Sequence, residues 1–271
     1  MTDSALVPSS LVRDAPDKRA ATQKLGVVAR AAAVFRMDRL VVFPDREGEG
    51  EWGGGFVETV LQYATTPPYL RKEAFGTRDE LECAGVLPPL RVPSWTGSES
   101  DDSGSLREGI VTQVGPEGRV RVNCGLQHPL SLHAGDRSVS EGERVTVRVS
   151  SRSPVRAKLV DAPSPGPQVH RADLDAALDG AGLRVATSRH GLPLTVDRLP
   201  DLVDRGRDGL AVAFGAPGRG LAELLGESPP ADPADPPGGF DVWLNTIPNQ
   251  GSEVVRTEDA MVASLACLTL R

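Results

Sequence analysis

The chain has 271 residues, of which 39% are hydrophobic, 25% are charged and only 4% are aromatic. This length and composition are typical of a soluble globular protein with one large or two smaller domains, and they exclude disordered and fibrous chains. No apolar run approaches the roughly 20 residues that cross a bilayer. The first 19 residues lack the basic and apolar regions of a signal peptide, so we expect the protein in the cytoplasm.

Cysteine and histidine residues are few and scattered. Cys83, Cys124 and Cys267 show no paired spacing, which predicts neither a disulfide framework nor a structural zinc site. His128 and His133 lie five residues apart without further ligands, so no metal is expected there, and the other two histidines are expected to face solvent.

The net charge of −7 is unevenly distributed. Residues 107–158 carry 9 basic and 5 acidic groups, whereas residues 1–106 carry 12 and 16 and residues 159–271 carry 9 and 16. The middle segment is therefore basic between two acidic ones. Scatter in a short window is one explanation. The other is a module that binds a polyanion such as RNA, because lysine and arginine displace counterions from phosphates.

The first part of the chain predicts alternating strands and helices. Residues 4–10 and 39–43 are short apolar runs typical of buried strands. Between them, apolar residues recur at helical spacing over 17–37. A further helix is predicted at 56–64. The order strand–helix–strand indicates a parallel sheet.

The region from about 91 to 167 differs in pattern. It begins with the polar linker SWTGSESDDSGS and ends with DAPSPGPQ. Between these linkers, EGIVTQV, GRVRVNCG and ERVTVRVSS alternate apolar and polar residues, which indicates half-buried antiparallel strands. A small inserted β-barrel fits this pattern, and an OB-like barrel is one of several that would. The predicted domains are an α/β domain of residues 1–91 and 166–271 and an inserted domain of residues 92–165.

The α/β pattern returns after the insert. The final helix, at 256–270, is apolar almost all round, which predicts burial in the core or at a subunit interface. A stretch with five prolines in fourteen residues, at 226–239, must be a surface connection. The other predicted elements are a helix at 173–181, strands at 184–188, 209–214 and 240–244, and the start of a helix at 221–225.

Two of these strands lead into glycine-containing loops, GAPGRG at 215–220 and NTIPNQG at 245–251. Parallel sheets bind ligands at the carboxyl ends of their strands, and glycine lets a ligand approach the backbone. GAPGRG matches neither the dinucleotide-binding nor the phosphate-binding motif. Either loop alone could be a plain turn, but two after consecutive strands indicate a ligand site.

Three segments carry a family resemblance. KLGVVARAAAVFRMDRLVVF (24–43), FGAPGRGL (214–221) and LNTIPNQGSEVVRTEDAMVASLACL (244–268) resemble, in order, the three motifs of the SPOUT methyltransferases. Within that superfamily the chain resembles the RNA uridine N3-methyltransferase family in its LVRDAPDKR opening and its TPPYLRK, GVLPPLRVP, TSRHG and WLNTIPNQG segments. The matches cover nearly the whole chain outside the insert.

The resemblance implies a SPOUT-type parallel sheet with a C-terminal trefoil knot, a rare exception among folds, plus an inserted OB-like domain. It implies S-adenosyl-L-methionine as cofactor, held in the knot, and no metal. It also implies a homodimer whose active sites are shared between subunits. RNA, most simply rRNA, would bind the inserted domain and the dimer cleft, and no membrane is involved. The cofactor-binding residues implied by the motifs are Thr187, Gly215, Ala216, Pro217, Gly220, Leu244, Asn245, Thr246, Ile247, Pro248, Gly251 and Thr257.

Arg30 and Arg36 are the catalytic candidates. Arg30 matches the first-motif arginine that the 2′-O-methylating SPOUT branch uses near the target ribose, and Arg36 could assist with phosphate. Its helix is otherwise apolar, so burial of the Arg30 guanidinium would be costly unless an anion meets it, and a substrate phosphate or charge on the target base would supply that anion. The alternative for Arg30 is an ion pair with an acidic residue of the same or the partner subunit.

Other polar residues near the motifs have simpler alternatives. Arg13, Asp14 and Asp17 follow the first strand, and for Asp17 a helix-capping role is at least as well supported as a catalytic one. Thr187, Ser188 and Arg189 are expected to end a strand beside the cofactor. Thr257 is expected to cap the last helix, and Glu258 would favour the helix dipole there.

The resemblance predicts methyl transfer to a uridine base. N3 must lose its proton before it can attack, either to a base or with charge stabilisation by a cation such as Arg30, and we favour the cation. Because N3 lies on the pairing edge, the target must be single-stranded or flipped out. Two alternatives remain: a methyltransferase with a small-molecule or peptide substrate, and a non-catalytic RNA-binding or assembly protein.

Overall fold

The computed structural model describes residues 2–45, 47–53, 55–92, 104–135, 137–152, 154–227 and 236–270. Most of the linker predicted at 94–105 and part of the proline-rich connection lie outside these residues. The chain forms two compact units, which are Met1–Gln62, Glu80–Pro88 and Pro167–Arg271 for unit 1, and Tyr63–Asp79 and Pro89–Gly166 for unit 2.

Unit 1 contains a six-stranded sheet in the order β11-β9-β10-β1-β2-β8. Every neighbouring pair of strands is parallel, which confirms the prediction of a parallel sheet. The strands are β1 (Ser4–Pro8), β2 (Arg39–Phe43), β8 (Gln168–Arg171), β9 (Leu183–Pro193), β10 (Leu210–Ala213) and β11 (Val242–Asn245).

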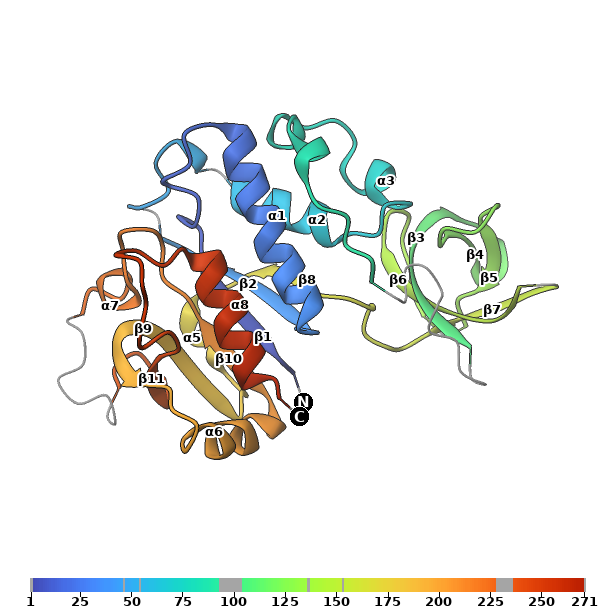
Figure 1. The fold of residues 1–271 in the computed structure, drawn as a ribbon. Coiled ribbons are helices and arrows are strands. Elements are labelled where there is room, and N and C mark those ends of the chain that lie inside the picture. The colour runs from blue at the N-terminus through green and yellow to red at the C-terminus, as the bar shows by residue number, and fades with distance from the viewer. Residues whose placement is uncertain are drawn as a thin grey trace. The chain divides into compact units, whose positions relative to one another are not determined.

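Helices cover both faces of this sheet. Leu6, Val41 and Trp243 pack with α5 and α7 on one face, and on the other α8 lies beside α1 (Figure 1). The helices are α1 (Lys18–Val34), α2 (Phe56–Thr65, which extends into unit 2), α5 (Leu174–Leu178), α6 (Leu199–Arg205), α7 (Leu221–Leu224) and α8 (Thr257–Leu268).

Helix α1 begins and ends for local reasons. The Asp17 carboxylate accepts a hydrogen bond from the Ala20 N–H at 2.7 Å, so the capping role of Asp17 is confirmed. The helix stops at Val34, earlier than predicted, because Arg36 adopts a left-handed backbone with φ of 54°.

Strand β8 and helix α6 were not predicted. Strand β8 has the polar sequence QVHR and lies at the edge of the sheet, so it lacks an apolar run. Helix α6 buries only Leu202, which leaves no helical apolar pattern to recognise.

Unit 2 is built on a five-stranded antiparallel sheet in the order β5-β4-β3-β6-β7. The two edge strands contact each other, so the sheet is a nearly closed barrel. Its core is formed mainly by valines. In β4 exposed Arg119 and Arg121 alternate with buried Val120 and Val122, as predicted. The elements are α3 (Arg71–Phe75), β3 (Ser105–Val114), β4 (Arg119–Asn123), β5 (Leu130–His133), β6 (Arg144–Arg152) and β7 (Val155–Val160).

A buried carboxylate lies on β3 of unit 2. Glu108 is only 1% exposed, and its Oε1 accepts a hydrogen bond from Arg144 Nη1 at 3.0 Å. The Oε2 atom has no hydrogen-bond partner among the described residues. Burial raises the pKa of Glu108, and Arg144 opposes this shift only in part.

Glu108 should make the stability of unit 2 dependent on pH. Because the folded chain holds this proton more tightly than the unfolded chain, the free energy of unfolding should fall as the pH rises above the ordinary glutamate pKa of about 4.3. Glu108→Gln keeps an acceptor for Arg144 but cannot ionise, so its urea unfolding should depend less on pH between about 4 and 7. Glu117→Gln, at an exposed turn, is the control and should behave as wild type. Equal pH dependence in Glu108→Gln and wild type would contradict the assignment.

Candidate functional site

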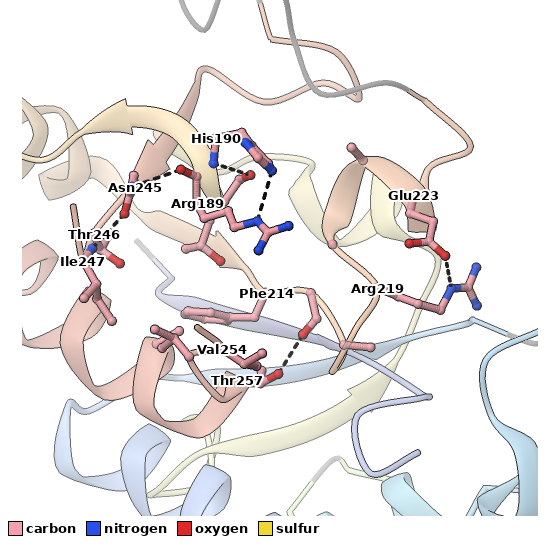
Figure 2. Close-up of a pocket in the computed structure, with 18 of the residues that line it drawn as sticks. Arg189, His190, Phe214, Arg219, Glu223, Asn245, Thr246, Ile247, Val254 and Thr257 are labelled. Carbon is pink, nitrogen blue, oxygen red and sulfur yellow. Dashed lines mark hydrogen bonds and ion pairs between the residues drawn. The ribbon is translucent and has the colours of Figure 1, made fainter. Parts of the chain in front are cut away.

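A cavity of about 520 Å³ lies beside β9 and beyond the carboxyl ends of β10 and β11 (Figure 2). Its volume is in the range of small-molecule binding sites. Strand β9 contributes Thr187 and the three residues after it, and the segments 214–227 and 244–260 contribute the rest.

Nine of the twelve predicted cofactor-binding residues line this cavity, namely Thr187, Gly215, Ala216, Gly220, Leu244, Asn245, Thr246, Ile247 and Thr257. Pro217, Pro248 and Gly251 do not line it. A Cβ atom at Gly251 would meet nothing within 4 Å. No neighbouring atom of the chain therefore requires glycine at this position.

Strand β9 is longer than predicted, so Thr187, Ser188 and Arg189 do not end it. The strand continues to Pro193. At Gly191 a Cβ atom would be 2.7 Å from the Trp243 carbonyl oxygen, so only glycine permits this close approach to β11. The register of the two strands shifts at this point.

Several lining residues were not predicted. Phe214 and Val254 form apolar wall, and His190, expected to face solvent, is exposed but lines the cavity. Glu223, Glu227 and Glu253 add carboxylates. Arg189, which was expected beside the cofactor, also lines the cavity. The GAPGRG segment was the available signal for Arg219, whereas isolated glutamates carry no motif.

The loop 215–220 is a tight turn. Ala216 and Arg219 exchange two backbone hydrogen bonds, of 2.9 and 3.0 Å. Gly218 between them has a φ of 71°, which favours glycine, and Pro217 precedes it as in a type II turn. The turn gives this part of the cavity wall a defined shape.

Arg219 anchors that turn to the rest of the sheet edge. Its Nη1 lies 2.8 and 3.1 Å from the two carboxylate oxygens of Asp45, and its Nε donates to Glu223 at 3.0 Å. Asp45 is buried, and its backbone N–H donates to Ser9 Oγ at 2.8 Å. The network thus joins the chain after β1, β2 and β10. Asp45 was not identified from the sequence.

The opposite wall of the cavity is the loop after β11, and side chains of this loop form the hydrogen bonds that hold it. Asn245 Nδ2 donates to the Arg189 carbonyl at 3.0 Å, and its Oδ1 accepts from the Ile247 N–H at 3.0 Å. The Thr246 and Ser264 hydroxyls lie 2.9 Å apart. These bonds tie the loop after β11 to β9 and to α8.

Thr257 joins the two walls instead of capping α8. It is the first residue of the helix, and its Oγ1 donates to the Gly215 carbonyl at 2.9 Å. The predicted capping role is therefore wrong, because the hydroxyl is used by the neighbouring loop. Glu258 lies in the first turn, as predicted.

The two catalytic candidates lie elsewhere in unit 1. Arg30 is exposed on α1 and does not line the cavity. Helix α1 turns the face with Val27, Arg30 and Val34 outward, so within a single chain the Arg30 guanidinium is not buried. Arg36, beyond the helix, is also exposed.

A second, more open cavity of about 620 Å³ adjoins the first. It is lined by Arg13, Asp14, Glu47 and Pro217, and it shares three lining residues with the first cavity, namely Gly218, Arg219 and Glu223. The described residues contain no group of three or more histidine, cysteine, aspartate or glutamate side chains that could hold a metal ion. Nor does any helix in the described part of the chain have the length and apolarity to cross a membrane.

The sequence is similar to methyltransferases along its whole length. The family described as "Putative RNA methyltransferase" matches residues 2–268. The 28S rRNA (uridine-N(3))-methyltransferase of Homo sapiens is 32% identical, over 98% of this chain and 77% of its own length. An uncharacterized protein of Halobacterium salinarum is 68% identical, over 100% of this chain and 99% of its own length.

The anchoring role of Asp45 can be separated from general stability. Asp45→Asn removes the charge that holds Arg219, so amide hydrogen exchange in residues 216–220 should become faster. The free energy of unfolding should fall by about 1–3 kcal/mol. Asp241→Asn is the control, because Asp241 forms a similar pair with Arg184 at 3.0 and 3.2 Å near the start of β9. Exchange in 216–220 should not change in the control. An equal response in both variants would contradict the anchoring role.

Proposed function

Because the chain belongs to this family of RNA methyltransferases, we propose that it transfers a methyl group from S-adenosyl-L-methionine to N3 of a uridine in ribosomal RNA. The observation that carries the proposal is the cavity between the loops 215–220 and 244–251, the two segments that resemble SPOUT motifs. Its surroundings suit both the cofactor and a reaction that depends on alignment. A substrate in ribosomal RNA also supports action in the cytoplasm.

The lining of the first cavity fits the chemistry of the cofactor. Phe214, Leu244 and Ile247 offer apolar contact for an adenine ring, and exposed backbone at the loop glycines suits hydrogen bonds to it. Glutamates such as Glu223 would attract the ammonium group, and Arg189 the carboxylate. When bound, the cofactor supplies a methyl group activated by a sulfonium. The protein's task is to hold both reactants in line and to exclude water.

We propose the trefoil knot for the C-terminal part of unit 1 on the strength of the motif resemblance. The position of β9 between β11 and β10 supports it, because the loops after these two strands then lie against the same neighbour. The bond from Thr257 to Gly215 is consistent with such threading.

The division into a methyltransferase domain and an inserted OB-like domain that reads RNA is likewise a proposal. Outward-facing cations on the antiparallel sheet support it. Arg119 and Arg121 are exposed on β4, and Arg156 and Lys158 on β7. Contacts between such residues and phosphates would add affinity without base specificity.

We also propose that the protein acts as a homodimer through α1 and α8. Both helices expose large apolar side chains, which include Val27 and Val34 on α1 and Val262 on α8. Arg30 lies on the same outward face of α1, away from the chain's own cavity. A dimer formed there would let Arg30 serve the active site of the partner subunit.

Two measurements test the proposed function. Calorimetry should show that the purified protein binds S-adenosyl-L-methionine, and failure to bind would favour a non-catalytic RNA-binding protein. Mass spectrometry of rRNA nucleosides should show that a strain lacking the gene loses 3-methyluridine and regains it with the gene. Unchanged 3-methyluridine in a strain whose protein binds the cofactor would favour a small-molecule or peptide substrate.

Arg30 should be required for transfer but not for folding. Arg30→Ala should slow methyl transfer by about 100-fold or more, as for lost transition-state stabilisation, and Arg30→Lys should not restore it because a point charge cannot replace the planar guanidinium. Cofactor affinity and dimer mass should match wild type. Arg19→Ala, on the exposed surface of the same helix, is the control and should remain active. If Arg30→Ala dissociates or unfolds the protein, the residue is structural.

A further inference from the structure

We propose that the second cavity receives the target uracil, with Asp14 accepting its N3 proton and Arg13 facing a carbonyl oxygen. This inference rests on the proposed function, uridine N3 methylation. It assigns roles to two residues that lie outside the predicted cofactor site.

The position of the cavity suits a methyl acceptor. It is lined by residues that follow β1 and β2, and the residues that it shares with the first cavity belong to the chain after β10. A base in this cavity would therefore lie next to a cofactor in the first one. Such proximity is what a direct displacement requires.

Arg13 is the cation available to a ligand there. Two described arginines line the cavity, and Arg219 is already held by Asp45 and Glu223. The Arg13 side chain is exposed and makes no hydrogen bond or ion pair with any described residue. Its charge is therefore free to stabilise negative charge on a ligand.

Asp14 is a half-exposed carboxylate paired with a lysine of α1. Its Oδ1 lies 2.9 Å from Lys24 Nζ, and the Lys24 side chain is only 9% exposed. On its other side, Lys24 Nζ lies 3.8 Å from Oε2 of buried Glu258, which has no hydrogen-bond partner among the described residues. Lys24 is thus shared by two carboxylates. The Oδ2 atom of Asp14 makes no hydrogen bond within the described structure and remains available to a ligand.

The uracil edge is complementary to this pair. Uracil presents the N3–H donor between two carbonyl acceptors, which matches a carboxylate acceptor beside a guanidinium donor. Cytosine presents an acceptor at N3, which a carboxylate would repel. Asp14 and Arg13 would therefore select uridine over cytidine as well as act on it.

The same arrangement supports the chemical step. The N3 proton passes to Asp14, and the electron pair left on N3 forms a bond to the methyl carbon. The carbon–sulfur bond breaks, and its electrons remain on sulfur. Arg13 stabilises the charge that develops on the carbonyl oxygen while the proton leaves.

The test compares single-turnover methylation of a uridine-containing RNA by wild type, Asp14→Asn and Arg13→Gln. Asp14→Asn should lower the rate by about 10²–10⁴-fold, the range for loss of a general base. Its rate should then rise about tenfold per pH unit, because only uridine ionised by solvent can react, whereas wild type should depend less on pH. RNA that carries 5-fluorouridine, whose N3–H is more acidic, should partly restore the variant. Glu47 and Glu223 also line the cavity. If Asp14 is the base, the rate of Glu47→Gln should depend on pH as the wild-type rate does.

A binding measurement adds a readout other than activity. With the protein loaded with S-adenosylhomocysteine, Arg13→Gln should bind uridine 5′-monophosphate about tenfold more weakly than wild type does. Since the Arg13 side chain makes no hydrogen bond or ion pair with any described residue, this variant should fold normally even if Asp14→Asn does not. Glu82→Gln is the matched control for Asp14→Asn, because Glu82 also pairs at 2.9 Å with a lysine of α1, in this case Lys18. This control should leave the rate and the nucleotide affinity unchanged.

The outcomes separate this inference from the proposed function. If wild type does not methylate uridine N3, the proposed function fails. If wild type methylates it, but folded Asp14→Asn keeps the wild-type rate and Arg13→Gln keeps wild-type nucleotide affinity, the second cavity is not the uracil site. If Asp14→Asn loses activity without the steeper pH dependence or the gain with 5-fluorouridine, Asp14 is not the base.

Discussion

The parallel sheet of unit 1 is the constraint on which the candidate site depends. Parallel strands must be joined by crossovers, and their carboxyl ends therefore meet at one edge. With β11, β9, β10, β1 and β2 adjacent in the sheet, segments from distant parts of the sequence lie side by side at this edge. The first cavity is lined by residues of β9 and of the chain at the ends of β10 and β11, and the second by residues that follow β1, β2 and β10. The order of the strands therefore determines which segments form the site, and individual side chains then shape it.

Short loops at such an edge have few buried apolar contacts of their own, so other interactions must fix their conformation. In this protein, hydrogen bonds and ion pairs of polar side chains do so. Thr257 holds the Gly215 end of the second-motif loop, and Asp45 holds its Arg219 end. Arg219 is only 15% exposed and its partner Asp45 only 7%, so water screens this pair less than a surface pair. Because these loops are already ordered, ligand binding does not have to order them, which favours a reaction that depends on the alignment of its reactants.

Charged groups in the two units are used in different ways. In unit 1, the partly buried Lys24 and Arg219 each contact two carboxylates. The exposed guanidiniums of Arg13 and Arg30 remain for external partners. In unit 2, Glu108 is buried on one strand while the arginines of β4 point outward. The outward cations suit phosphates, and the inward carboxylate has a raised pKa because of burial.

Local sequence was sufficient for the main elements and for most of the cavity. Apolar runs and periodicity predict β2, α1 and the three valine-rich strands of unit 2, because burial of a strand or helix face requires that pattern. The family resemblance predicts nine lining residues, six of which lie in the two glycine loops. Tertiary structure alone decided the pair of Asp45 and Arg219, which are 174 residues apart, the use of the Thr257 hydroxyl, and the exposure of Arg30. These three features depend on which surfaces meet after folding. The sequence around a polar side chain has no periodic pattern from which its partner could be predicted.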